Sequence, residues 1–213
     1  DENNFFGKGS VQLLKHHGTY QQDDRDVRGQ IQDDGNKKRF IYMVRTRIPG
    51  GRLTTEQFLA QMDLCDELGN STLRITSRQT LQLHGVIKSD LKATIKRIND
   101  TQLTTLAACG DVARNTMCTP APYQNDIYQE LRDLTDEIAE HLRPRTSTYH
   151  ELWLTDTDNG EKCLAGGDSE ASLSGYEGDD TEPIYGRQYL PRKFKIGIAL
   201  PHDNCSDVYT HDL

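Results

Sequence analysis

The sequence lacks long apolar runs and has few apolar residues of any kind. Hydrophobic residues make up 34% of its 213 residues and aromatic residues 7%, with a single tryptophan. This is a low apolar share for a soluble domain. The longest apolar run near the end is Ile196–Leu200, far short of the roughly 18–20 residues that a membrane helix requires. The N-terminus has neither a basic flank nor an apolar stretch, so no signal peptide is visible. We therefore expect no membrane association.

Cysteine is also scarce, with residues at positions 65, 109, 118, 163 and 205 only. An odd number at wide, irregular spacing is a poor disulfide framework, and no Cys-x-x-Cys pair indicates a zinc or redox site. We expect isolated thiols in a reducing compartment and no metal site built from them. This cysteine usage favours a cytoplasmic protein or one from a plastid-like interior.

The sequence has no excess of basic residues. Its net charge of −8 comes from one acidic stretch, residues 156–183. That stretch holds nine acids and one base, and the rest of the chain keeps 24 of the 33 acids and 24 of the 25 bases. A nucleic-acid-binding domain needs a strongly basic face, so we expect no nucleic-acid partner. The Gly, Ser and Asp content of the acidic stretch predicts a solvated loop without a packed core.

The order of predicted elements in the first half of the chain favours an α+β fold. Residues 1–38 form an N-terminal arm, and its polar part, residues 7–38, is expected to be extended with little helix or strand. The elements that follow are a strand over Phe40–Ile48 closed by Pro-Gly-Gly, a helix capped by Thr54 or Thr55 and ending at Leu68, strands over Thr72–Ser77 and Thr80–Lys88, and a helix over Asp90–Asn99. This order is most of a ferredoxin-like unit. We place it at residues 39–118, with its fourth strand near 105–118.

Residues 119–213 begin with a predicted helix over Asn125–Leu142. Its apolar stripe at steps of three and four consists of Ile127, Leu131, Leu134, Ile138 and Leu142. The later pattern predicts strands over Tyr149–Leu154, Arg192–Leu200 and Asp207–Tyr209, with the acidic stretch between the first two. Because Leu213 follows a strand-like segment without a closing helix or polar tail, the chain looks truncated there.

A row of hydrogen-bond donors follows one face of the predicted hairpin between residues 74 and 84. Side chains alternate between the two faces of a strand, so one face carries Arg74, Thr76, Arg78, Thr80, Gln82 and His84. No acid occurs from Leu73 to Ser89. The guanidinium group is a planar fork of donors suited to carboxylate or phosphate. The pattern therefore fits either an ordinary half-exposed sheet or an anion-binding surface.

Further cations repeat this theme on other strands. Arg45 and Arg47 are expected on one face of the first strand, and Lys193 and Lys195 on one face of Arg192–Leu200, while Arg114 lies beside a glycine turn. Cations on an apolar strand are costly to bury without an anion. Either these faces are solvated or several of them converge on one anionic site, and the spacing does not choose between the two.

Five segments of the chain resemble the sirohaem-dependent sulfite and nitrite reductases. They are HGTYQQDDRD (17–26), VRTRIPGG (44–51), LRITSRQTLQLHGV (73–86), GDVARNTMCTPAPY (110–123) and YLPRKFKIGIALPHDN (189–204). They occur in the family's order and together span nearly the whole chain. Agreement of this length by chance is not a serious alternative.

The resemblance implies a ferredoxin-like half-domain followed, over residues 119–213, by the first part of a sirohaem-binding α+β domain. It implies that the sulfite anion is bound by Arg45, Arg114, Lys193 and Lys195, with the two lysines supplying protons. It also implies that the carboxylates of sirohaem are contacted by Arg74, Arg78, Gln82 and His84. Sirohaem carries eight carboxylates, which would explain a strand face made of donors without acids.

The implied reaction is the six-electron reduction of sulfite to sulfide in sulfur assimilation. The implied cofactors are sirohaem and a [4Fe–4S] cluster, and the implied electron donor is ferredoxin or a flavoprotein reductase. The family's Cys-x5-Cys and Cys-x3-Cys pairs have no counterpart here, so we expect the cluster ligands C-terminal to this chain. The chain alone should then be inactive. Two alternatives stay open: a ferredoxin-dependent nitrite reductase, and a sirohaem- or anion-binding module without catalysis.

One residue bears on the choice between sulfite and nitrite. In the family, the sulfite branch typically has Arg-Lys-Phe-Lys and the nitrite branch resembles Arg-Lys-Phe-Asn. This chain has Lys195 at the deciding position, and its Gln-Leu-His-Gly hairpin end also resembles the sulfite branch. The resemblance therefore favours sulfite.

Overall fold

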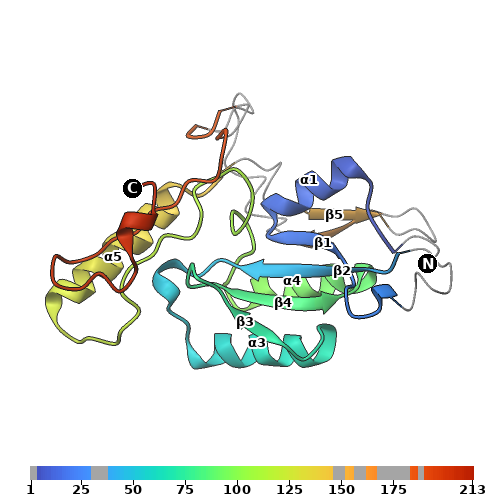
Figure 1. Cartoon of the computed structure of the whole chain (residues 1–213), viewed down its shortest axis with the longest axis horizontal. Helices are drawn as coiled ribbons and strands as arrows, with labels where there is room; N and C mark the ends of the chain where they lie inside the picture. Colours follow the sequence, from blue (N-terminus) through green and yellow to red (C-terminus); the bar gives the residue numbers. More distant parts are fainter. Residues whose placement is uncertain (1–3, 30–37, 146–151, 156–161, 167–182, 187–189) are drawn as a thin grey trace.

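The fold is organised around an antiparallel sheet of four strands (Figure 1). The computed structural model of the chain describes residues 4–29, 38–145, 152–155, 162–166, 183–186 and 190–213. The strands lie in the order β1 (Thr19–Asp23), β2 (Phe40–Thr46), β4 (Leu81–Val86) and β3 (Leu73–Ile75). All three pairings are antiparallel. The predicted α+β class with a ferredoxin-like half-domain is confirmed.

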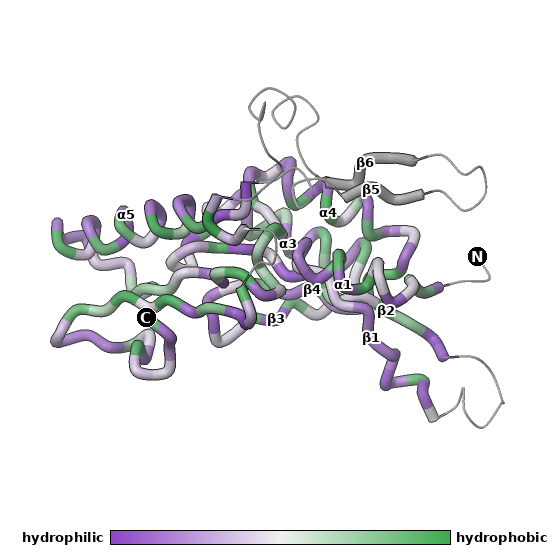
Figure 2. Tube along the Cα trace, turned by 90° about the horizontal axis from the view of Figure 1, so that it is seen from above, coloured by the Kyte–Doolittle hydropathy of each residue, from purple (hydrophilic) through white to green (hydrophobic). Residues whose placement is uncertain are grey.

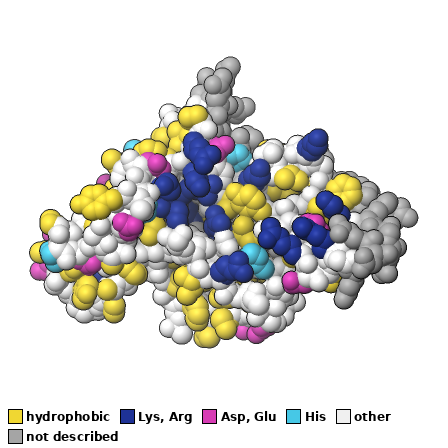
Figure 3. All heavy atoms as spheres, viewed as in Figure 1, with side chains coloured by type: hydrophobic (Ala, Val, Ile, Leu, Met, Phe, Trp, Pro, Cys, Tyr) yellow, Lys and Arg dark blue, Asp and Glu magenta, His cyan; other side chains and the backbone are white. Residues whose placement is uncertain are grey.

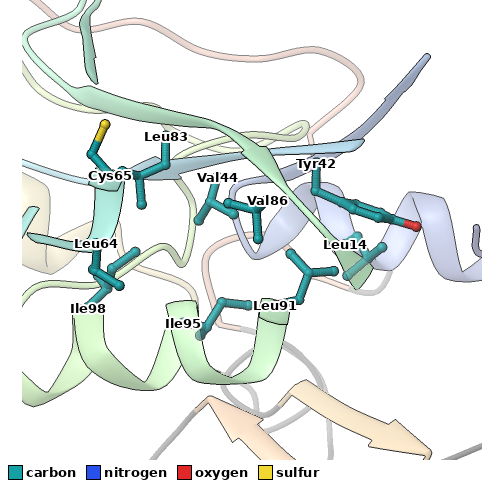
Figure 4. Close-up of a cluster of buried hydrophobic side chains, with 10 residues drawn as sticks. All are labelled: Leu14, Tyr42, Val44, Leu64, Cys65, Leu83, Val86, Leu91, Ile95 and Ile98. Carbon is teal, nitrogen blue, oxygen red and sulfur yellow. The ribbon is translucent and has the colours of Figure 1, made fainter. Parts of the chain in front are cut away.

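Helices cover one face of this sheet and form the main core with it (Figure 4). They are α1 (Lys8–His16), α3 (Thr55–Leu68) and α4 (Leu91–Asp100), the last preceded by the 3₁₀ turn η2 (Lys88–Asp90). The buried side chains of this core are Leu14, Tyr42, Val44, Leu64, Cys65, Leu83, Val86, Leu91, Ile95 and Ile98. The helix predicted over Asp90–Asn99 is confirmed, with Leu91, Ile95 and Ile98 on its inner side.

Helix α3 begins with a capping box, as its sequence predicts. The Thr54 hydroxyl accepts from the Gln57 backbone N–H at 3.2 Å, and the Gln57 side chain accepts from the Thr54 N–H at 3.0 Å. These bonds satisfy two backbone donors that a helix N-terminus otherwise leaves free.

Thr54→Ala should lower the free energy of unfolding by about 1 kcal/mol, because the helix loses its side-chain cap. Chemical denaturation monitored by circular dichroism measures this difference. The matched control is Thr55→Ala, one residue inside the exposed start of α3. A loss of the same size in the control would show that the cap is not responsible.

The fourth strand of the sheet is not at residues 105–118, and that prediction is wrong. The position beside β2 is occupied by β1, with Thr19 opposite Val44. The expectation of little helix or strand over residues 7–38 is wrong for the same reason, since α1 and β1 lie there. Gly18 (φ +68°) makes the turn between them, and a Cβ there would lie 2.5 Å from the Arg45 carbonyl oxygen.

Residues 112–117 instead pair with the segment that follows Arg192. Isolated parallel bridges join Ala113 to Phe194 and Met117 to Gly197. The predicted strand over Arg192–Leu200 is therefore an extended segment with single bridges. The predicted strand over Asp207–Tyr209 is wrong, because the chain forms a 3₁₀ turn there, η3 (Val208–Thr210).

Two antiparallel strands, β5 (Leu152–Thr155) and β6 (Lys162–Gly166), flank part of the acidic stretch. Strand β6 lies within residues 156–183, and its backbone comes close to α4. The expectation of a loop throughout that stretch is therefore wrong for β6. The rest of the stretch, apart from Pro183, lies outside the described residues, as do Tyr149 to Glu151 of the predicted strand.

Helix α5 (Asp126–His141) matches the predicted range, but its buried side differs from the predicted stripe. Asn125 caps it by accepting from the Tyr128 N–H at 3.0 Å. The buried residues are Tyr128, Leu131, Arg132, Thr135 and Ala139, whereas Ile127 is 56% exposed and Leu134 45% exposed. Hydrophobic and hydrophilic residues alternate around this helix (Figure 2). The buried side of α5 packs against Cys118, Ile198 and Leu200. The orientation of α5 is therefore set by these tertiary contacts as well as by the spacing of its apolar residues.

Candidate functional site

The sheet face opposite the helices presents a row of polar and cationic side chains. Val44 and Leu83 point into the core, so their neighbours Arg45 and Gln82 point the other way. Arg45 lies opposite Gln82, and Gln82 lies opposite Arg74. Strands β2, β4 and β3 therefore bring Arg45, Gln82 and Arg74 side by side.

The buried amide of Gln82 connects Arg45 to His84. A guanidinium group can only donate, so the amide oxygen must face Arg45, and it accepts from Arg45 Nε at 2.9 Å. The amide nitrogen then donates to His84 Nε2 at 3.3 Å. Burial, followed by Arg74 and Arg45, lowers the pKa of His84. His84 is thus held as a neutral imidazole that accepts at Nε2.

Arg114 joins this row through a shared backbone acceptor. The Ala108 carbonyl oxygen accepts from Arg45 Nη1 at 3.4 Å and from Arg114 Nη1 at 3.5 Å. Arg114 Nε also donates to the Gly110 carbonyl at 2.8 Å. Two guanidinium groups therefore lie next to each other, and both donate to the same carbonyl oxygen.

Backbone pairing brings the segment that carries both candidate lysines next to Arg114. The Arg114 N–H donates to the Phe194 carbonyl at 2.8 Å, and Phe194 separates Lys193 from Lys195. Lys193 is exposed and Lys195 half-buried. The Lys195 ammonium donates to the Thr210 carbonyl at 2.7 Å. An ammonium has three donors, so two remain for other acceptors.

Arg78 lies where the hairpin meets these two segments. Its Nη2 donates to the Asn115 carbonyl at 2.6 Å and to the Ile196 carbonyl at 3.2 Å. Burial, with a smaller contribution from Arg114, lowers the pKa of Arg78 to about 10. Arg78 therefore stays cationic at neutral pH.

These contacts bring together seven of the eight residues that the sequence singled out, and Lys193 is placed only by its backbone neighbour Phe194. Lys and Arg side chains gather across the middle of the face in Figure 3, with Asp and Glu scattered around them. The sequence left solvation and convergence open, and the contacts of Arg45 and Arg114 favour convergence, while Arg74 and Lys193 are exposed. The arrangement can bind an anion, because several cations share one surface where the backbone carbonyls already hold their geometry.

Arg47 is an exception to the predicted cationic face. It follows the end of β2, is 4% exposed, and donates through Nη2 to the Ala139 carbonyl at 2.6 Å near the end of α5. Burial lowers its pKa to about 10. Residues two apart share a face only within a strand, and β2 ends at Thr46. Arg47 therefore does not face the cationic surface with Arg45 but joins α5 to the sheet.

Sequence reasoning missed four residues beside this site. Tyr20 and Cys109 hydrogen-bond to each other near Arg45 and Arg114, and burial raises the pKa of both groups. His16 lies against Gly110, and His211 lies near Arg78 and Lys195. Tyr20 lies in the segment HGTYQQDDRD and could have been found there. The two histidines carry no local signal that marks them.

The described residues hold no group of three or more His, Cys, Asp or Glu side chains that could bind a metal ion. Cys65, Cys109, Cys118 and Cys205 are free thiols. In the same part of the chain, no helix combines the length and the apolar character that crossing a bilayer requires.

Comparison with known families identifies the class of protein that this fold and site define. The nitrite/sulfite reductase ferredoxin-like half domain matches residues 34–101, and the nitrite and sulphite reductase 4Fe-4S domain matches residues 110–213. The chain belongs to the nitrite and sulfite reductase family.

Particular relatives are also similar over nearly the whole chain. It is 48% identical over 203 residues to the sulfite reductase [NADPH] hemoprotein beta-component of Staphylococcus haemolyticus, covering 95% of this chain and 33% of that protein. The protein of the same name from a Paenibacillus species is 47% identical, with coverage of 94% and 33%. The chain therefore spans about a third of the length of these relatives. The structure of the Mycobacterium tuberculosis NirA protein shares the fold, with a TM-score of 0.60 at 20% identity over 91% of this chain and 29% of that one.

Proposed function

We propose that the full-length protein containing this chain reduces sulfite to sulfide, and that this chain supplies the anion-binding side of its active site. The observation that carries this proposal is the convergence of Arg45, Arg114 and Lys195 on one surface through shared backbone contacts. The name sulfite reductase on the similar relatives supports sulfite as the substrate.

This family uses sirohaem and a [4Fe–4S] cluster, and the sheet face of this chain fits the first of these two cofactors. A tetrapyrrole with many carboxylates needs an uncovered surface rich in donors. The row Arg45, Gln82 and Arg74 is such a surface, and His84 adjoins it. Arg74 is exposed and Arg78 half-buried, and both would hold carboxylates of the ring. No residue of this chain is proposed as a cluster ligand.

When bound, the two cofactors supply the electrons for the six-electron reduction. The residues of this chain bind and orient the anion. Arg45 and Arg114 each present a planar fork of donors, so they act as anchors for the oxygens of sulfite. Lys193 and Lys195 supply positive charge and exchangeable protons at the same surface, which stabilises negative charge on oxygens that leave as water.

The electron donor is assigned by the same reasoning. The words NADPH and beta-component in the names of the relatives support a separate NADPH-dependent flavoprotein component as the partner of the full-length protein, with ferredoxin as the alternative. The free thiols of Cys65, Cys109 and Cys118 fit a reducing compartment such as the cytoplasm.

The test uses the full-length protein and two arginine variants. The wild-type protein should oxidise reduced methyl viologen with sulfite as acceptor, and faster than with nitrite. Arg74→Ala should bind sirohaem about tenfold to a hundredfold more weakly, because it loses a charge-assisted hydrogen bond. Sirohaem content per chain, measured by absorbance, follows this loss. Arg97→Ala, on α4 and paired with Glu67 at the surface, is the control and should keep its sirohaem.

Each outcome has a separate meaning. A wild-type protein that reduces nitrite only would favour the nitrite reductase alternative, and one that carries sirohaem without turnover would favour a binding module. Equal sirohaem content in Arg74→Ala and wild type would contradict the assignment of the sheet face.

A further inference from the structure

His211 lies against the part of the cationic surface that Lys195 and Arg78 form. Residues 195–197 run beside residues 211–213, with the Asp212 N–H donating to the Lys195 carbonyl at 2.9 Å and the Gly197 N–H donating to the Leu213 carbonyl at 3.0 Å. The imidazole ring lies directly on Gly197. A Cβ at that position would be 1.9 Å from His211 Nδ1, so only glycine leaves room for the ring.

Four charged groups surround His211, from the hairpin turn, from residues 195–197 and from its own segment. Arg78 and Lys195 are the cations, and Asp207 and Asp212 are the acids. Asp212 is partly engaged, because its carboxylate accepts from the Lys195 N–H at 2.8 Å. The Lys195 ammonium is fixed on the Thr210 carbonyl, one residue before His211.

Two buried nitrogen atoms at this place have no hydrogen-bond partner within the described residues. They are Nδ1 of His211 and Nε of Arg78. Buried polar atoms are usually satisfied, so an unpartnered imidazole nitrogen next to two cations is a site where a proton can be added without breaking a hydrogen bond. His84 differs, because its Nε2 already accepts from Gln82.

We propose that His211 takes up a proton when an anion binds to Arg45, Arg114, Lys193 and Lys195, so that anion binding is coupled to proton uptake. This rests on the proposed function of that surface. Before binding, burial and then Arg78 and Lys195 lower the pKa of His211, while Asp207 and Asp212 oppose them. A bound anion offsets the field of the two cations, which favours the imidazolium form.

Linkage fixes the direction of the effect. If the anion raises the pKa of His211, then protonated His211 must raise the affinity for the anion by the same factor. Affinity is therefore highest below the pKa of His211 in the free protein and falls as the pH rises through the pKa of the bound form. The proposed reaction consumes protons. With this coupling, substrate binding also places a proton on His211, close to Lys195.

The test measures proton uptake on sulfate binding to the full-length protein. Sulfate keeps its two charges across the neutral pH range, so any proton taken up belongs to the protein. Calorimetric titration at pH 6 in two buffers of different ionisation enthalpy gives the number of protons bound. His211→Asn and His211→Gln should each take up fewer protons than wild type. They should also bind sulfate about threefold to tenfold more weakly at pH 6, the effect of one screened charge near an anion.

His141→Asn, in the exposed last turn of α5, is the matched control and should behave like wild type. Sirohaem absorbance per chain verifies that each variant is folded. Unchanged proton uptake in both His211 variants would overturn the coupling while leaving the anion site intact. Failure of the wild-type protein to bind sulfate would instead contradict the proposed anion site itself.

Discussion

Lys195→Asn is expected to lower sulfite turnover of the full-length protein by roughly a hundredfold to a thousandfold, the usual cost of removing a donor that acts on developing charge. Sirohaem content should stay unchanged, because Lys195 is not among the residues proposed to hold the carboxylates of the ring. Nitrite reduction should fall less. Lys195 is thereby predicted to select between the two anions and not only to support turnover.

The reason is electrostatic. Sulfite at neutral pH is a mixture of monoanion and dianion, whereas nitrite is only a monoanion and has fewer oxygens to remove. Lys195 adds a second ammonium beside Lys193, on a segment that Arg114 holds through the Phe194 carbonyl. Asparagine at this position keeps a donor but supplies neither the charge nor a transferable proton. Sulfite, which must lose more oxygens, is therefore affected more.

Steady-state rates for both anions, together with sirohaem content per chain, measure this effect. Lys96→Asn is the matched control, since Lys96 lies on α4 on the helix-covered side and pairs at the surface with Asp100. Its rates should stay near wild type for both substrates. Equal losses for sulfite and nitrite in Lys195→Asn would mean that Lys195 is a general element of the site and not a selector.

Most elements of the ferredoxin-like half could be predicted because their signals are local. Aromatic and β-branched residues mark β2, and a threonine at 54 or 55 marks the start of α3. The spacing of Leu91, Ile95 and Ile98 marks α4. Strand β1 has no such signal, because its sequence TYQQD carries no apolar alternation. It is a strand because the open edge of β2 supplies backbone hydrogen bonds to it.

The candidate site shows the same division between local and long-range information. That Arg74, Gln82 and His84 share a face follows from strand alternation and could be read from the sequence. That Arg45, Arg114 and Lys195 meet them could not. Their meeting depends on the Ala108 carbonyl and on the bridge between Ala113 and Phe194, which join segments far apart in the sequence. The spacing of the cationic residues in the sequence could not predict that they converge. That expectation came from the resemblance to the reductase family.

Asn115 is the residue that joins these distant segments, and its loss is predicted to have the largest effect on stability. Its amide is 2% exposed and accepts from the Ile48 N–H at 3.0 Å. It donates to the Ile48 carbonyl at 2.6 Å and to the Arg78 carbonyl at 2.8 Å. One side chain therefore joins Ile48, two residues beyond β2, and the hairpin turn to the segment that carries Arg114.

Asn115→Ala should lower the free energy of unfolding by about 3 kcal/mol or more, because buried backbone groups of Ile48 and Arg78 lose their partner and each costs about 1–3 kcal/mol. Denaturant titration measures the loss. Asn99→Ala, in the last turn of α4, is the control and should change stability by less than about 0.5 kcal/mol.

Asn115→Asp separates the hydrogen bonds from the packing, since it keeps the shape but has no donor when ionised. Burial should raise the pKa of this carboxyl group in the folded protein above its unfolded value. The protonated form can donate one hydrogen bond. The loss in free energy of unfolding relative to wild type should therefore be smallest below the unfolded pKa and grow as the pH rises through the folded pKa.

Two results would contradict this role of Asn115. A loss in Asn115→Asp that does not vary with pH, or a loss below about 1 kcal/mol in Asn115→Ala, would mean that other contacts hold the hairpin against residues 110–118. In that case the position of Arg78 beside Arg114 and Lys195 would depend on packing and not on this amide.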